Sequence, residues 1–116
     1  MKRGEVRWYT FKPPDKRRPV LILTRDSAIG FLHALTIAPI TSTIRHIPSE
    51  VFLSRADGLL TECAINLDNL QTVPKSNIGE LIAYLSPERM EEVERAVNFA
   101  LGFDSLLWYE RSEQWR

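Results

Sequence analysis

Two groups of side chains in this sequence have chemistry suited to a phosphate. Arg18 stands directly before a proline and an apolar run, and Thr41 begins a run of three hydroxyl side chains. A guanidinium group binds phosphate oxygens through two parallel hydrogen bonds, and a hydroxyl group can donate a further one. Both groups lie at the ends of predicted strands, where binding residues are commonly presented. The residue types alone also fit a surface arginine and an ordinary turn, and they favour that simpler explanation.

The strand that must position Arg18 is predicted to begin at Pro19 and to end near Arg25. Residues 20–23 form a short apolar run with two β-branched members, which is typical of a strand buried on both faces. Proline suits the first position of a strand, where the ladder needs no donor. Pro19 also restricts Arg18 to extended backbone conformations. The sequence therefore predicts an arginine held at the mouth of a rigid core strand.

The other elements predict a small domain built mainly from strands. Further strands are expected over residues 5–11, 35–41, 51–53, 63–67, 70–73 and 81–85, and a loop is expected over residues 26–30. Thr41 ends one of these strands. Pro39 lies inside the same strand and indicates that it is an edge strand or contains a bulge.

One amphipathic helix is predicted to close the domain. Ser86 and Pro87 form a typical helix start, because serine caps the first turn and proline is tolerated there. Gly102 supplies the C-terminal stop. Apolar residues recur between them at helical spacing; they are Met90, Val93, Val97, Ala100 and Leu101. The fold class is therefore mainly β with a C-terminal helix.

Length and composition exclude several classes of protein. With 116 residues, of which 44% are hydrophobic, the chain suits one globular domain rather than a disordered segment. The single cysteine, Cys63, excludes an intrachain disulfide, and no apolar run reaches the roughly 18 residues that span a bilayer. The N-terminus lacks the apolar core of a signal peptide. We therefore expect a cytoplasmic protein without a membrane segment.

The formal net charge of +0 hides an uneven distribution along the chain. Residues 1–46 hold nine Lys or Arg and three Asp or Glu, a balance of +6, whereas residues 47–116 hold six and twelve, a balance of −6. This asymmetry predicts a basic working face and an acidic remainder. Charges scattered over the whole surface would give the same count, so both interpretations stay open at this point.

Other catalytic chemistries find little support in the spacing of residues. His33, His46 and Cys63 lack the spacing of a zinc site, so no metal is expected, and Cys63 is predicted to be buried in a strand. The sequence contains neither a nucleophile-elbow motif nor a glycine-rich phosphate loop. The aromatic residues of the first strand are predicted to belong to the core rather than to stack on bases; they are Trp8, Tyr9 and Phe11.

Five segments, in order along the chain, resemble the MazF/PemK (Kid) family of type II toxins. They are residues 3–6 with Trp8, 18–23, 38–42, 66–73, and 85–86 with the final helix. The resemblance covers residues 1–103, which are predicted to form the toxin-like domain, with residues 104–116 as a C-terminal extension. It implies a small SH3-like or PemK-like β-barrel of the CcdB/Kid/MazF type that works as a homodimer.

The resemblance also implies a toxin of a type II toxin–antitoxin system that cleaves RNA. Members of the family are mostly sequence-specific, metal-independent endoribonucleases, so no cofactor is expected. Single-stranded RNA is the implied substrate, with messenger RNA first and transfer or ribosomal RNA as further candidates. The ribose 2′-OH would serve as the internal nucleophile. A co-expressed acidic antitoxin is the implied partner.

The family's catalytic arginine falls on Arg18 of this sequence and its catalytic threonine on Thr41. Arg18 would stabilise charge on the phosphate, and Thr41 would donate a hydrogen bond to it. Two departures from the family are visible, because the loop before Arg18 is shortened to residues 12–17 and Gln71 stands where many relatives carry an arginine. The residues expected to bind substrate are Lys16, Arg17, Ser42, Thr43, His46 and Asp68.

Two other functions remain compatible with the same segments. A non-enzymatic toxin of the CcdB type would bind a topoisomerase, and an inactive regulator would only bind an antitoxin; neither needs both Arg18 and Thr41. The extension 104–116 is predicted to cap the barrel, with a place in the antitoxin groove as the alternative. Its large apolar side chains are Leu106, Leu107, Trp108, Tyr109 and Trp115.

Overall fold

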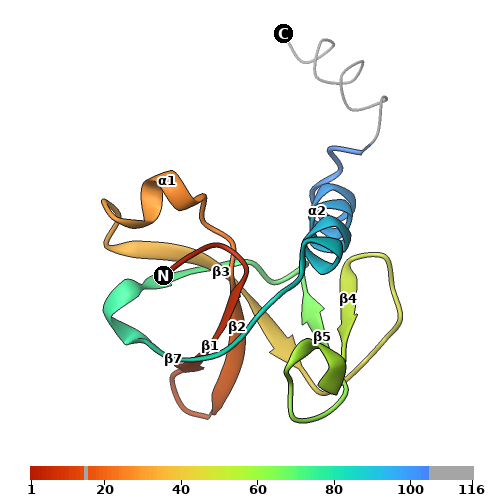
Figure 1. Cartoon of the computed structure of the whole chain (residues 1–116), viewed down its shortest axis with the longest axis horizontal. Helices are drawn as coiled ribbons and strands as arrows, with labels where there is room; N and C mark the ends of the chain where they lie inside the picture. Colours follow the sequence, from red (N-terminus) through yellow and green to blue (C-terminus); the bar gives the residue numbers. More distant parts are fainter. Residues whose placement is uncertain (15, 105–116) are drawn as a thin grey trace, which may run out of the picture.

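Seven antiparallel strands form one strongly curved sheet, and a C-terminal helix packs against one part of it (Figure 1). The computed structural model describes residues 1–14 and 16–104. The strands are β1 (Glu5–Thr10), β2 (Arg17–Ile22), β3 (Ala34–Thr41), β4 (Glu50–Leu53), β5 (Cys63–Asn66), β6 (Gln71–Pro74) and β7 (Ile78–Tyr84). The helices are α1 (Asp26–Ile29) and α2 (Pro87–Leu101), with 3-10 turns η1 (Arg55–Asp57) and η2 (Lys75–Asn77). The predicted fold, mainly β with a C-terminal helix, is confirmed.

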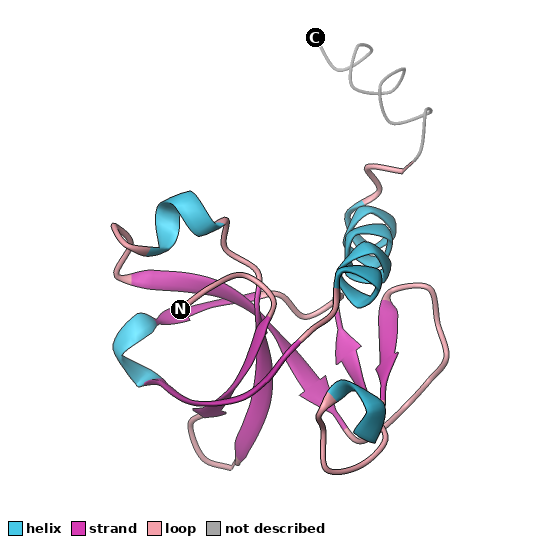
Figure 2. Cartoon of the chain, viewed as in Figure 1, coloured by secondary structure: helices cyan, strands magenta, loops and turns pink. Residues whose placement is uncertain are grey.

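The order of the strands explains the barrel-like shape. Within the described residues the strands run β4-β5-β3-β2-β1-β7, and β6 pairs with β3. The long strand β3 therefore takes part in both halves of the molecule, as the strand arrows in Figure 2 show. β4 and β7 remain at the two ends of this order, so the described sheet curves like a barrel without closing.

The strand that carries Arg18 is buried on both faces, as predicted. Val20 and Ile22 pack into one apolar cluster and Leu21 packs into another, and all three have 0% exposure. Successive side chains of a strand point to opposite faces, so β2 contributes to both clusters. Each fully buried side chain of this kind stabilises the fold by about 1.5–3 kcal/mol. β2 therefore provides a rigid base for its first residues.

The sequence predicts that Pro39 marks an edge strand or a bulge; β3 is a central strand, so the edge is wrong, and its register with β2 shows no bulge. On one side β3 pairs with β2 in an unbroken register, in which Pro39 lies opposite Val20. On the other side, residues 34–37 pair with β6 and residues 40–41 pair with β5. Pro39 lies between these two partner strands, where its missing N–H leaves no ladder bond unmade.

α2 begins and ends where the sequence predicts. The Ser86 hydroxyl accepts a hydrogen bond from a backbone amide of the first turn at 3.2 Å, and Gly102 ends the helix in a left-handed conformation at φ 78°. The predicted apolar face is confirmed for four residues that pack on the sheet; they are Met90, Val93, Val97 and Ala100. It is wrong at Leu101, which is 49% exposed, and Ala96 is buried instead.

Three further predictions have clear outcomes in the described residues. Residues 26–29 form the one-turn helix α1 rather than a loop, and the buried side chain of Ile29 anchors this turn in the cluster around Val20. Cys63 is buried in β5, as predicted. No helix of the described chain is long and apolar enough to cross a membrane. Residues 105–116 lie outside the described residues, so the capping role of the extension stays a prediction.

Candidate active site

Arg18 and Thr41 lie at the ends of two neighbouring strands. β2 and β3 pair antiparallel, and Val20 lies opposite Pro39 at the last pair of this ladder. The same register, extended by two residues beyond the ladder, would place Arg18 opposite Thr41 on the same face of the sheet. β3 changes partner at this point, because Thr41 pairs with β5 instead. The two side chains therefore flank the point where β2 and β3 part.

The hydroxyl group of Thr41 is arranged as a hydrogen-bond donor. The backbone N–H of Thr43 donates to Thr41 Oγ1 at 3.1 Å, which occupies one acceptor position of the oxygen. The hydroxyl hydrogen remains for an external acceptor such as a phosphate oxygen. Arg18 and Thr41 are both half-buried, so each side chain is accessible to a substrate and partly held by its neighbours.

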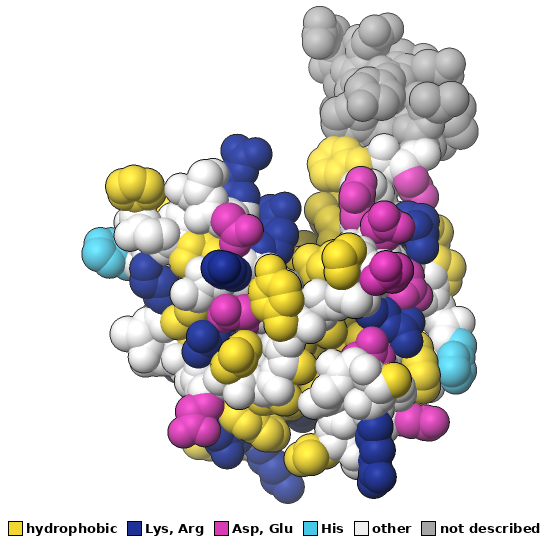
Figure 3. Space-filling model, in the orientation of Figure 1, with side chains coloured by type: hydrophobic (Ala, Val, Ile, Leu, Met, Phe, Trp, Pro, Cys, Tyr) yellow, Lys and Arg dark blue, Asp and Glu magenta, His cyan; other side chains and the backbone are white. Residues whose placement is uncertain are grey.

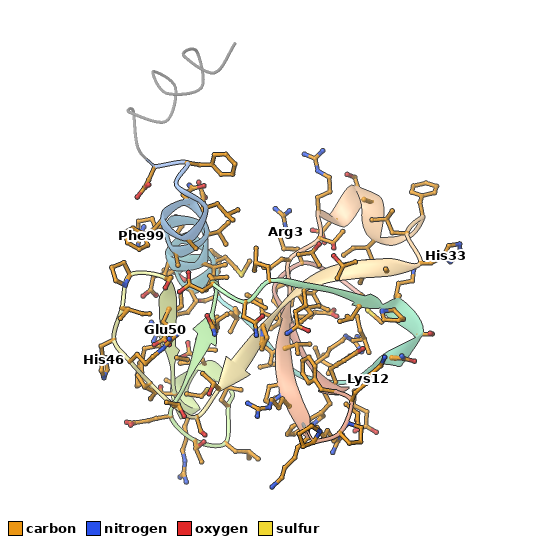
Figure 4. All side chains as sticks on the ribbon, turned by 180° about the vertical axis from the view of Figure 1, so that it is seen from behind. Arg3, Lys12, His33, His46, Glu50 and Phe99 are labelled. Carbon is orange, nitrogen blue, oxygen red and sulfur yellow. The ribbon has the colours of Figure 1, made fainter. Side chains whose placement is uncertain are left out.

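The loop 42–48 leaves the end of β3 and carries three predicted substrate-binding residues. These residues, Ser42, Thr43 and His46, are all exposed. Glu50, at the start of β4, anchors the loop through Arg45. Its carboxylate accepts hydrogen bonds from the backbone N and from Nε of Arg45, both at 2.9 Å. His46 and Glu50 lie on the same side of the molecule in Figure 4.

Asp68 fastens the far end of the same loop. The Ser49 hydroxyl, which is almost fully buried, donates a hydrogen bond to the Asp68 carboxylate. A backbone hydrogen bond of 3.0 Å from Leu67 N to Ser49 O runs beside it. Asp68 thus holds Ser49, the residue that follows the loop 42–48. Its own contact with substrate stays a prediction.

Arg17 and Arg18 point to opposite faces of β2. The Arg17 guanidinium lies 4.3 Å from the centre of the Trp8 ring on β1, a cation–π contact. Arg18 lies opposite Tyr9 on the other face. Tyr9 belongs to the core, as predicted, whereas Trp8 is only partly buried. The two adjacent arginines therefore project from different faces of the strand.

Acidic side chains gather over α2 on the face that Figure 3 shows. This gathering follows from the sequence of α2, which carries Glu88, Glu91, Glu92 and Glu94. The Lys and Arg side chains drawn on the same face are spread over several places. Acidic residues of the C-terminal part of the sequence thus gather over α2, while the basic residues form no single patch on the described part of this face.

The groups with a perturbed pKa are Asp57 on η1, Arg89 on α2 and Cys63 on β5, whose neighbour Ala64 pairs with Thr41. Burial acts to raise the pKa of Asp57, but hydrogen bonds from Arg89 Nε (3.0 Å) and Ser54 N (2.9 Å) outweigh it and hold that pKa below its ordinary value. The hydrogen bond with Asp57 raises the pKa of Arg89. Burial, with the charge of Asp57, raises the pKa of the Cys63 thiol. The contact between Asp57 and Arg89 fastens α2 to η1.

Potential metal ligands are dispersed. His33 and His46 lie on opposite sides of the molecule in Figure 4. Within residues 1–14 and 16–104, no three His, Cys, Asp or Glu side chains are grouped as a metal-binding set. The candidate site, as the described residues show it, is built around an arginine and hydroxyl groups.

A groove of about 1040 Å³ opens elsewhere, between α2 and the N-terminal half of β3. Its lining is mostly apolar and includes Leu23, Leu70, Met90 and Val97, with Arg3 as one of its charged residues. Neither Arg18 nor Thr41 lines it, so the groove is separate from the candidate active site.

Two contacts near the site were not predicted from the sequence. Arg45 and Glu50 are oppositely charged residues on either side of Pro48, and this arrangement was the available signal for their ion pair. The contact of Arg17 with Trp8 depends on the register of the β1–β2 hairpin, which the sequence alone does not specify.

Solved structures share this fold. The Mycobacterium tuberculosis toxin MazF-mt6 matches with a TM-score of 0.78 and 34% sequence identity over 84% of this chain and 96% of its own. An endoribonuclease from a mycobacterial species, solved in complex with its cognate antitoxin, matches with a TM-score of 0.78 and 25% identity over 88% of this chain and 95% of its own. The fold is therefore that of the MazF-type toxins.

Sequence comparison leads to the same class. Endoribonuclease MazF3 of Mycobacterium tuberculosis is 38% identical over 90 residues, which cover 78% of this chain and 87% of that protein. The family model described as PemK-like, MazF-like toxin of type II toxin–antitoxin system matches residues 2–101. The chain belongs to this family of toxins.

Proposed function

We propose that this chain acts in the cytoplasm as a sequence-specific, metal-independent endoribonuclease and is the toxin of a type II toxin–antitoxin pair. The proposal is supported by the register of β2 and β3, in which Val20 lies opposite Pro39; extended by two residues, this register would place Arg18 and Thr41 on one face, where β3 changes partner. A relative that is 38% identical is named an endoribonuclease, which supports the same activity for this chain. Single-stranded RNA is the proposed substrate, with messenger RNA first.

Cleavage needs no external nucleophile, because RNA carries one. The ribose 2′-OH attacks the adjacent phosphorus, and a phosphorane with increased negative charge forms. The bond from phosphorus to the 5′ oxygen of the next nucleotide then breaks. The 2′-OH loses one proton and the 5′ oxygen gains one, so the products are a 2′,3′-cyclic phosphate and a 5′-hydroxyl. The protein has to orient the phosphate and stabilise its charge.

Arg18 and Thr41 match these two tasks. Arg18 donates two N–H groups to the non-bridging oxygens, where the charge increases. Thr41 donates its hydroxyl hydrogen to the same phosphate, because Thr43 N already occupies an acceptor position of the threonine oxygen. A guanidinium group stays protonated in proteins, so Arg18 serves as a charge stabiliser rather than as a general base.

The exposed loop 42–48 supplies the neighbouring contacts in this proposal. Ser42, Thr43 and His46 position the nucleotide beside the cut, and they are presented on a loop that is fastened at Glu50. Bases of single-stranded RNA are available to such a loop because they are not held in a helix. The remaining proposed contacts are Lys16, Arg17 and Asp68.

The proposed partners are a second copy of the chain and an acidic antitoxin. A mycobacterial endoribonuclease of the same fold was solved with its cognate antitoxin, which supports a protein inhibitor for this chain as well. A disordered acidic segment that folds on binding can cover a large area with few residues. The exposed cations Lys12, Lys16 and Arg17 would attract it.

The test uses purified protein, a single-stranded RNA of mixed sequence and excess chelator. We expect cuts at a defined sequence and a 2′,3′-cyclic phosphate at each cut. A substrate with a 2′-deoxy nucleotide before the cut should resist cleavage at that position. Absence of cleavage in a folded sample would contradict the proposal and favour a binding toxin of the CcdB type or an inactive regulator. Cleavage of the 2′-deoxy substrate would contradict the mechanism.

A further inference from the structure

We propose that Arg45 is a further phosphate-binding residue and that the buried carboxylate of Glu50 is its positioning residue. The inference rests on the proposed RNA cleavage, because it extends the same site from Thr41 along the loop 42–48. Arg45 binds a further phosphate of the RNA, beyond the one that is cut. Glu50 touches no RNA and acts through Arg45.

Glu50 holds Arg45 at two points. Its Oε1 accepts a hydrogen bond from the backbone N of Arg45, and its Oε2 accepts one from Nε, both at 2.9 Å. The Glu50 side chain is 3% exposed, whereas that of Arg45 is 50% exposed. A buried carboxylate bound at these two atoms fixes the backbone of the loop and the direction of the guanidinium together.

This contact leaves the outer part of the guanidinium available. Arginine has five N–H donors, and the contact through Nε uses one of them. Within residues 1–14 and 16–104, Nη1 and Nη2 of Arg45 have no hydrogen-bond partner. Two coplanar amino groups suit two oxygens of one phosphate, which a lysine ammonium cannot match. Arg45 is therefore both anchored and ready to bind an anion.

The loop connects Arg45 directly to the candidate active site. It starts at Thr41, whose Oγ1 accepts the hydrogen bond from Thr43 N. The residue after Arg45, His46, has a left-handed backbone with φ 53°, which is uncommon for a residue other than glycine. Such a conformation persists where its surroundings hold it, and the Arg45–Glu50 pair lies next to it. The pair thus sets the shape of the loop that meets the substrate.

Positioning and simple electrostatics predict opposite results for one substitution. Glu50→Gln removes a negative charge near the RNA path, so electrostatic attraction alone would raise RNA affinity. The carbonyl of the introduced glutamine can still accept from the backbone N of Arg45, but its amide group cannot accept from Nε. If Glu50 positions Arg45, the affinity of Glu50→Gln for the cleaved RNA falls even though the protein becomes more positive. The sign of the change separates the two explanations.

The experiment measures binding of an uncleavable RNA analogue, with a 2′-deoxy nucleotide at the cut, over a series of salt concentrations. We expect Arg45→Ala to weaken binding about tenfold and to reduce the salt slope by about 0.7, the value for one phosphate on a single strand. Arg45→Lys should recover the slope but not the full affinity, because it keeps the charge and loses the planar fork. Arg45→Ala retains the backbone hydrogen bond to Glu50, so its loop is expected to stay folded.

The matched control is Glu92→Gln, which makes the same charge change at another glutamate that accepts from an arginine, at 2.9 Å on α2. We expect weaker binding for Glu50→Gln, unchanged binding for Glu92→Gln, and no further loss when Glu50→Gln is added to Arg45→Ala. If the wild type cleaves RNA but Glu50→Gln binds it equally or more tightly, or Arg45→Ala has an unchanged salt slope, the inference is overturned and the proposed function is not. A wild-type protein that neither binds nor cleaves RNA would instead overturn the proposed function.

Discussion

Thr41→Val removes one hydroxyl group from the candidate site with little change in shape. Valine has the same branched outline as threonine and also favours strands, so β3 should keep its pairing with β5. Two interactions are lost. The phosphate loses the proposed donor, and the backbone N–H of Thr43 loses its acceptor at 3.1 Å.

The two losses differ in size and in the measurement that detects them. Removing one donor to a developing oxyanion typically costs about 10²–10³ in kcat. Losing the acceptor of Thr43 N costs at most about 1 kcal/mol of stability, because this exposed amide can bind water instead. For a domain of this size, that corresponds to a decrease in Tm of about 5 °C. The expected loss of activity is therefore much larger than the loss of folded protein at 25 °C.

The assay is single-turnover cleavage of a short RNA, with a melting curve for each variant. Thr41→Ser keeps the hydroxyl group and should retain most of the activity. The control is Thr36→Val, the same substitution at another threonine of β3, and it should leave the cleavage rate unchanged. Cleavage by Thr41→Val at more than half the wild-type rate would refute the assigned donor role. An equal loss in Thr41→Ser and Thr41→Val would also refute it, because the hydroxyl would then not be the critical group.

Three further changes test other parts of the structure. Gly58→Ala should lower the free energy of unfolding by about 2–4 kcal/mol, because Gly58 has φ 93° and the added methyl group would lie 2.9 Å from a side chain of β7; a wild-type melting curve would contradict this. Burial acts to raise the pKa of Asp57, but its hydrogen bonds, chiefly that from Arg89, hold it below 3.8. The ionised Asp57 carboxylate therefore stabilises the folded protein at pH 7, and this stabilisation is lost as the carboxylate is protonated at low pH. Arg89→Ala should therefore destabilise the protein at pH 7 more than at about pH 2, and equal losses in urea unfolding at both pH values would disprove this link. Arg17→Ala should cost about 0.5–1 kcal/mol through the lost contact with Trp8 and reduce the salt slope of RNA binding by about 0.7, and an unchanged slope would remove Arg17 from the RNA path.

Local patterns in the sequence predict most of the fold. Residues 20–22 are fully buried because an apolar run with no polar interruption can lie between two clusters. The caps of α2 are equally local, since Ser86 and Gly102 satisfy the helix ends with their own backbone conformations and side chains. Such features need no knowledge of distant partners.

Features that depend on partner strands were harder to predict. Pro39 lies in a central strand because β6 and β5 share one side of β3, and this sharing depends on segments far along the chain. Leu101 fits the helical spacing, yet Ala96 and Ala100 pack on the apolar cluster at this end of α2, and Leu101 is exposed. The pattern along one element does not specify which edge of its apolar face meets the partner.

In the candidate site, too, local features were predictable from the sequence and features that depend on partner strands were not. The positions of Arg18 and Thr41 at strand ends follow from local sequence, but their placement on one face depends on the register of β2 and β3. Arg17 and Arg18 look equivalent in the sequence, whereas alternation along β2 sends them to opposite faces. The contact of Glu50 with Arg45 depends on the turn between β3 and β4. Site geometry is therefore less evident from the sequence than element type.

The role of Arg18 in catalysis is tested by comparing cleavage of single-stranded RNA by wild type, Arg18→Ala and Arg18→Lys in excess chelator. We expect defined cuts by the wild type, a loss of about 10³-fold or more in Arg18→Ala, and weak recovery in Arg18→Lys, which cannot form the two parallel hydrogen bonds. The melting curve of Arg18→Ala should stay close to that of wild type, because Arg18 lies outside both apolar clusters. Cleavage by folded Arg18→Ala at the wild-type rate would show that Arg18 is not a catalytic residue.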